Sequence, residues 1–169
     1  MRHILRRREW LADEWRYPGE DPADPPGDAA LIVPFAQWRT DPQGWRGRAA
    51  RLGVQIAPAE RVEELAAELP CLSLVAVEFP NPGDGRGYSH ARLLRERFGF
   101  TGELRAVGAG VRQDQVFLLA RCGFDALELA AGEDPQAALR ALARYDVAYQ
   151  PGAPQVAIRR QRFFGADGR

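Results

Sequence analysis

Short apolar runs alternate with segments of helical character along most of the chain. The clearest run, residues 72–79, is almost continuously apolar, which is typical of a strand buried on both faces of a parallel sheet. Gly99 and Gly123 suit the ends of helices, since glycine readily adopts the left-handed conformation found there. The predicted strands are residues 31–33, 54–57, 72–79, 104–107, 126–129 and 147–149; the predicted helices are residues 58–69, 90–98, 111–122 and 135–144, and residues 35–45 form irregular structure or a short helix.

This alternation predicts an α/β fold with a parallel sheet, because parallel strands are joined by crossovers that usually contain a helix. We expect the β/α repeats to lie in sequential order, so that the sheet resembles part of a β/α barrel with its helices mainly on one face. The opposite face then needs a cover, which a second copy of the chain could provide in a homodimer. The alternative is a doubly wound open sheet with helices on both faces.

One α/β domain, residues 29–150, is predicted between two segments of different composition. Residues 1–28 combine a basic, aromatic arm with a Pro/Asp-rich loop, and residues 151–169 form a basic, aromatic tail. The arm contains three consecutive arginines at positions 6–8. They could bind an anionic partner or remain solvated, as short charged runs commonly do.

Composition excludes several classes of function. The 169 residues carry a formal net charge of zero, so no overall field attracts nucleic acid or a membrane, and neither is an expected partner. The chain has no lysine, which excludes a lysine Schiff base and a Walker-type phosphate loop. Two separated cysteines and two histidines argue against a metal site and a disulfide framework, and no cofactor motif is recognisable. Without a signal-peptide core or an apolar run of about 20 residues, the expected location is the cytoplasm.

The glycine-rich segment at residues 83–89 is the main candidate site. It follows the strongest strand, and ligands of open α/β sheets bind beyond the carboxyl ends of strands. Its backbone N–H groups and nearby arginines could bind an anion, with Ser89 as the N-cap of the next helix, and the alternative is a tight turn without a ligand. The candidate anion-binding residues are Gly85, Arg86, Gly87, Ser89, Arg92 and Arg112, and the candidates for catalytic proton transfer are Asp84 and Tyr88.

A second loop, residues 108–114, should lie beside the first because the preceding strands are expected to be neighbours. Arg112 of this loop could face the same pocket as Arg86. Asp114 and Gln115 are further candidates there, although Asp114 could simply complement a helix dipole.

Three successive strands each carry one charged residue: Glu78, Arg105 and Glu128. Strand alternation places each of them on one face of the sheet with small or β-branched neighbours. On the inner face of a partial barrel they could converge as a Glu–Arg–Glu cluster that forms the floor of the pocket. The alternative is an ordinary ion-pair network on an incompletely covered sheet.

Several separated motifs resemble an uncharacterised bacterial family that is encoded beside assimilatory sulfite reductase. Its members are labelled as oxidoreductases of sulfite reduction. The resemblance spans about residues 30–130, and one departure is Ala109, where the family is commonly acidic. The motifs are residues 84–92, 102–108, 114–115 and 121–126.

The resemblance implies an accessory protein of assimilatory sulfite reduction that handles a sulfur oxyanion. The alternative is a non-catalytic protein that docks on sulfite reductase or its electron donor through its Trp-rich N-terminal segment and its basic tail. Whether the chain is an enzyme stays open, because a literal oxidoreductase would have to borrow its cofactor.

Overall fold

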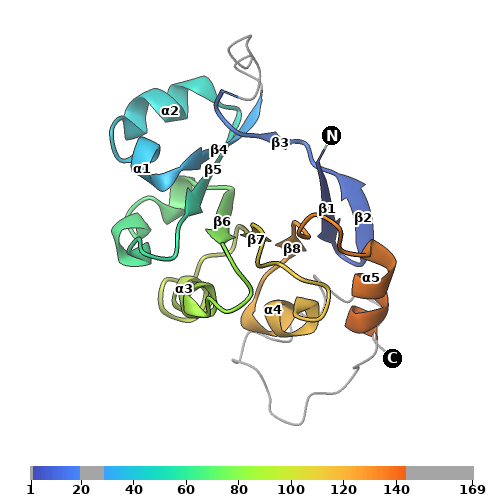
Figure 1. The fold of residues 1–169 in the computed structure, drawn as a ribbon. Helices are drawn as coiled ribbons and strands as arrows, with labels where there is room; N and C mark the ends of the chain where they lie inside the picture. Colours follow the sequence, from blue (N-terminus) through green and yellow to red (C-terminus); the bar gives the residue numbers. More distant parts are fainter. Residues whose placement is uncertain (1, 20–28, 144–169) are drawn as a thin grey trace.

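The computed structural model describes residues 2–19 and 29–143. Eight strands form one curled sheet in the order β2-β1-β8-β7-β6-β5-β4-β3 (Figure 1). The strands are β1 (His3–Arg6), β2 (Glu9–Ala12), β3 (Trp15–Arg16), β4 (Ala30–Pro34), β5 (Arg51–Ile56), β6 (Leu74–Glu78), β7 (Glu103–Val107) and β8 (Ala126–Leu127). Strands β3 to β8 are parallel and sequential, and the β1–β2 hairpin adds antiparallel to β8, so the predicted α/β architecture of a partial barrel is confirmed.

The helices lie on the outer side of the curl, as Figure 1 shows. A large apolar core fills the space between them and the sheet, with Val54, Val75 and Leu104 among the fully buried strand residues. The helices are α1 (Phe35–Trp38), α2 (Pro42–Arg48), α3 (Arg86–Arg92), α4 (Val116–Cys122) and α5 (Pro135–Ala143), and shorter turns are η1 (Val62–Leu65), η2 (Leu69–Cys71) and the π-helical η3 (Leu93–Arg97). None of the helices in the described part of the chain has the length and apolar character needed to cross a membrane.

The inner face of the sheet is filled by this chain's own residues. A small second cluster joins buried Trp15 to Ile32, Leu74, Ala76 and Val107. The side chains of this cluster all belong to the same chain.

Two residues connect opposite edges of the sheet. Strands β2 and β3 are its two edges, yet only Asp13 and Glu14 separate them in the sequence. An extended chain spans at most about 3.6 Å per residue, so the two edges must approach each other where this link crosses. The β2–β3 link therefore requires the sheet to curl.

A buried ion pair fixes the link to the middle of the sheet. The Nη1 atom of Arg105 on β7 lies 2.8 Å from Oδ2 of Asp13, and both side chains are fully buried. Arg105 also donates from Nε and Nη2 to Oε1 of Glu103, over 3.0 and 2.8 Å. Burial alone would lower the pKa of Arg105, but Glu103 and Asp13 outweigh it, so the pKa is raised and the side chain is charged.

The N-terminal arm is the largest difference from the sequence expectation. The described residues of this segment form the three strands β1, β2 and β3 instead of a separate arm. Strand β1 is part of the sheet because Ile4 and Leu5 are buried beside β8. The turn of the hairpin consists of Arg7 and Arg8, both with positive φ, rather than the usual Asn-Gly pair, which explains why the sequence did not predict it.

Several predicted helices also differ in extent. The segment predicted as a helix at 58–69 forms only the 3₁₀ turns η1 and η2. The helix predicted at 111–122 is shorter, because the loop after β7 extends to Gln115 and α4 starts at Val116. Ser89 is not an N-cap: α3 begins at Arg86. Gly99 and Gly123 do adopt the predicted positive φ. The strand expected at 147–149 and the tail lie outside the described residues.

Replacing Asp13 by Ala should destabilise the fold. The change leaves buried Arg105 with Glu103 alone and removes the anchor of the β2–β3 link, so the free energy of unfolding should fall by about 3 kcal/mol or more. Urea unfolding measures this. Glu14→Ala is the matched control, since that neighbouring side chain is 53% exposed and its pair with Arg51 should contribute less than about 1 kcal/mol. Equal losses from both changes would contradict the role given to Asp13.

Candidate functional site

Two glycine loops meet at the carboxyl ends of β6 and β7, as predicted. The backbone N–H of Gly110 donates to the carbonyl of Phe79 over 2.7 Å. The side chain of Gln115 donates to the carbonyl of Pro82 over 3.1 Å. The loop after β6 and the loop after β7 are thus in direct contact through backbone atoms.

Close backbone approach explains why glycine occurs in the second loop. A Cβ atom on Gly110 would lie 2.5 Å from the carbonyl oxygen of Asn81, and one on Gly108 would lie 2.6 Å from that of Phe79. Gly108 also has a φ of 106°, which side chains strongly disfavour. Backbone atoms cannot move aside as a flexible side chain can, so the two loops are locked together.

Arg86 is occupied by the carboxylate of Asp84. Its Nε and Nη2 atoms donate to the two carboxylate oxygens over 3.0 and 2.7 Å, and its backbone N–H donates to Oδ1 over 3.2 Å. The Arg86 side chain holds the pKa of Asp84 down, at about 2. Asp84 is therefore ionised at neutral pH, which makes it a poor proton donor, and Arg86 must leave this pair to bind another anion.

The other predicted arginines are also paired individually. Arg112 lies 3.3 Å from a carboxylate oxygen of Glu133, and Arg92 lies 3.3 Å from one of Glu96 on its own helix. Ser89 is exposed on α3 and Gly85 takes the N-cap position without a side-chain cap. Each of the three predicted arginines is thus paired with a neighbouring carboxylate, and would have to leave that pair or share it in order to bind an anion.

Tyr88 packs behind the first loop. Its ring contacts Phe79 edge-on at 5.2 Å between centroids. Burial raises the pKa of Tyr88, and Cys122 and Asp114 raise it further. The phenol is therefore protonated at neutral pH. Asp114 itself is exposed just before α4.

The predicted Glu–Arg–Glu cluster is not formed. Arg105 lies on the inner face as expected, but its guanidinium pairs with Glu103 and Asp13 instead of Glu78 and Glu128. Glu103 shares its strand and face two residues away, which places it closer than a carboxylate at the far ends of the neighbouring strands. Glu78 is opposite Val107 in the sheet register, so it lies beyond Arg105 towards the carboxyl edge.

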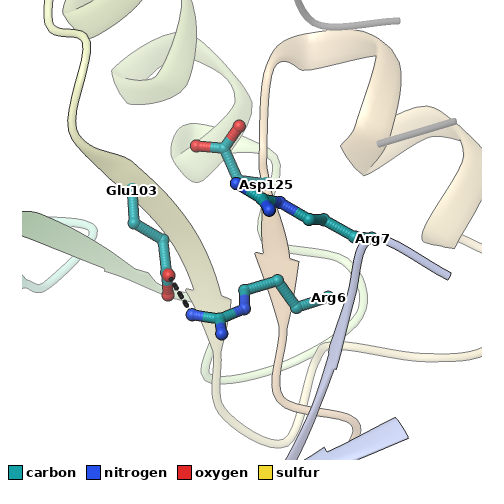
Figure 2. A pocket seen from close by; sticks show the side chains of 4 residues that line it. All are labelled: Arg6, Arg7, Glu103 and Asp125. Carbon is teal, nitrogen blue, oxygen red and sulfur yellow. Dashed lines mark hydrogen bonds and ion pairs between the residues drawn. The ribbon is translucent and has the colours of Figure 1, made fainter. Parts of the chain in front are cut away.

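A pocket that the sequence did not predict lies at the other end of the sheet. It has a volume of about 240 Å³ and is lined by Arg6, Arg7, Glu103 and Asp125 (Figure 2). Glu103 begins β7 and Asp125 immediately precedes β8, so the pocket is at the amino ends of these strands. Only the arginine run gave a sequence signal, since a single carboxylate before a strand has no distinctive pattern.

A second hollow lies elsewhere on the surface. It has a volume of about 290 Å³, lies beside η2 and has no charged side chain in its lining. In the described part of the chain, no group of three or more His, Cys, Asp or Glu side chains is placed to hold a metal ion.

His90 on α3 has a buried ring nitrogen. Its Nδ1 atom is shielded from solvent and has no hydrogen-bond partner among the described residues. Burial lowers the pKa of His90, although the nearby Glu63 acts in the opposite direction. The imidazole is therefore neutral at pH 7.

The chain matches a family model with the description "Bacterial protein of unknown function (DUF934)" over residues 53–158. The matched part contains both glycine loops, whereas Arg6 and Arg7 precede it. No curated protein sequence matches the chain.

Gly110→Ala should separate the two loops and destabilise the protein. The added methyl group collides with backbone, and relieving such overpacking costs about 1–3 kcal/mol. Gly85→Ala is the matched control, because a Cβ there meets nothing within 4 Å. Chemical unfolding should show a loss for Gly110→Ala alone, and similar values for both variants would contradict the locked arrangement.

His90 should make stability depend on pH. Because its folded-state pKa is lowered, the unfolded chain binds a proton more readily, and stability should fall as the pH drops below about 6.5. His90→Gln should lose less stability than the original chain between about pH 7.5 and about pH 5.5. Unfolding curves at the two pH values measure this difference. The same pH dependence in both proteins would refute the assignment.

Proposed function

We propose that this chain, which belongs to the DUF934 family of bacterial proteins, is an accessory protein of assimilatory sulfite reduction that docks on sulfite reductase or its electron donor. In this role it performs no redox chemistry itself. The pathway is supported by the sequence motifs of the two loops and their surroundings. The docking role is supported by the geometry of the loops, as follows.

The observation that carries the proposal is the locked pair of glycine loops. Backbone contacts of Gly108 and Gly110 with Phe79 and Asn81 leave these loops little freedom. A surface that is rigid before binding loses little conformational entropy when a partner binds. The loops therefore favour recognition of a large, preformed surface.

The charges at this edge favour a protein over a small anion. Arg86 is 59% exposed but is already held by two hydrogen bonds to Asp84. A small anion would have to replace a carboxylate that is covalently fixed beside the arginine. A protein partner can instead contact the pair as a whole, and arginine is enriched at such interfaces. Handling of a sulfur oxyanion at this edge is consequently the less favoured reading.

Arg86→Glu should weaken binding to the partner. The change converts a neutral Asp–Arg pair into two adjacent negative charges, and a misplaced charge at an interface should reduce affinity by about tenfold or more. The measurement is biolayer interferometry with purified sulfite reductase and, separately, its electron-donor protein, both from the bacterium that encodes the chain.

Arg51→Glu is the matched control for this experiment. Arg51 is also an exposed, ion-paired arginine, but it lies at the amino end of β5, away from the loops. Its variant should bind as the original chain does. If the original chain bound neither protein, or if both variants lost affinity equally, the proposal would be wrong.

A further inference from the structure

The pocket at the amino ends of β7 and β8 has two arginines with different surroundings. In Figure 2 the side chains of Arg6 and Arg7 extend from the hairpin to this pocket, where Glu103 and Asp125 complete the lining. Arg6 Nη1 lies 3.2 Å from Oε2 of Glu103. Arg7 makes no hydrogen bond or ion pair with any residue that the structure describes. We infer that this pocket binds a small inorganic oxyanion, with Arg7 as its principal ligand.

The two carboxylates of the pocket repel an anion less than two free carboxylates would. Groups in the interior of the protein are hydrogen-bonded to both of them. Asp125 accepts hydrogen bonds from the buried Arg95 and from the backbone N–H of Leu104. Glu103 accepts two hydrogen bonds from the buried Arg105. A carboxylate that is paired in this way no longer presents an uncompensated negative charge to the pocket.

The positive charge of the pocket is most accessible at Arg7. Each lining carboxylate has an arginine behind it in the interior, Arg95 for Asp125 and Arg105 for Glu103. Arg6 is paired with Glu103 from the side of the hairpin. Arg7 is exposed and has no carboxylate partner in the part of the chain that the structure describes.

The backbone at Arg7 is held in an unfavourable conformation. Arg7 has a φ of 51° and Arg8 a φ of 64°, a combination usually found with Asn-Gly in two-residue hairpin turns. Residues other than glycine seldom adopt this conformation, because the side chain crowds the backbone. The turn directs a guanidinium to a pocket that already holds Arg6. Arg7 can donate a pair of parallel hydrogen bonds to a tetrahedral oxyanion, and Arg6 can add the N–H groups that it does not use for Glu103.

The volume of the pocket is also appropriate for a small inorganic oxyanion. About 240 Å³ corresponds to several water molecules at about 30 Å³ each, which is enough for a sulfate-sized ion that keeps part of its hydration. The inference rests on this pocket alone and does not depend on the proposed docking function.

Arg7→Asn provides a sharp test. Asparagine adopts positive φ more readily than arginine, so the hairpin should keep its stability or gain some while the charge is lost. Isothermal titration calorimetry with sulfate, phosphate and acetate at low salt should show binding of sulfate and phosphate to the original chain, and acetate should bind more weakly. Arg7→Asn should reduce sulfate affinity by about tenfold or more. Arg7→Lys, which keeps the charge but not the planar fork, should fall between them.

Arg39→Gln is the matched control, since Arg39 is 57% exposed, is paired with Glu64, and directly follows α1 beyond the carboxyl end of β4, away from the pocket. Its affinity for sulfate should equal that of the original chain. Melting curves of every variant establish that the fold is intact. Absence of sulfate and phosphate binding in the original chain, equal binding by a stably folded Arg7→Asn variant, or a preference for acetate would overturn the inference.

Discussion

The Asp13–Arg105 ion pair is the interaction on which the rest of the structure depends. Asp13 lies in the two-residue link between the sheet's opposite edges, and Arg105 lies on one of its central strands. The link requires the sheet to curl, and the ion pair holds the link against the inner face, where the charged groups lie beside the small apolar cluster. Glu103 extends the same network to Arg6 at the opening of the pocket. The ion pair at the link and the charges that line the pocket thus belong to one connected network.

Local pattern was sufficient to predict the central repeats. Strand β6 is recognisable from its continuous apolar run, and the helix ends are recognisable from Gly99 and Gly123, so both depend only on nearby residues. The sequential order of the parallel strands followed from the short connections between them. The hairpin was missed because its strands have four residues each and its Arg7–Arg8 turn lacks a turn signal. Alternation correctly placed Arg105 on the inner face, but its partner Asp13 comes from a link whose position depends on closure of the whole sheet.

The site illustrates the same division between local and distant determinants. Adjacency of the two glycine loops followed from strand order, and their backbone contacts agree with it. The state of their arginines did not follow from composition, since Asp84 is adjacent in the sequence whereas Glu133 reaches Arg112 from a later segment. At the amino ends of β7 and β8, the charges of Glu103 and Asp125 are compensated by Arg105 and Arg95, which come from other positions in the sequence. Free and neutralised charges look identical in a sequence.

The topology has a consequence for the order of folding. Strand β1 precedes its partner β8 by about 120 positions in the chain, with Leu5 opposite Leu127. Such non-local pairing is entropically expensive and slows folding. The central parallel strands can assemble during synthesis, while the N-terminal hairpin must wait for β8 and then complete the sheet from both sides. Until that moment Ile4 and Leu5 remain accessible to chaperones.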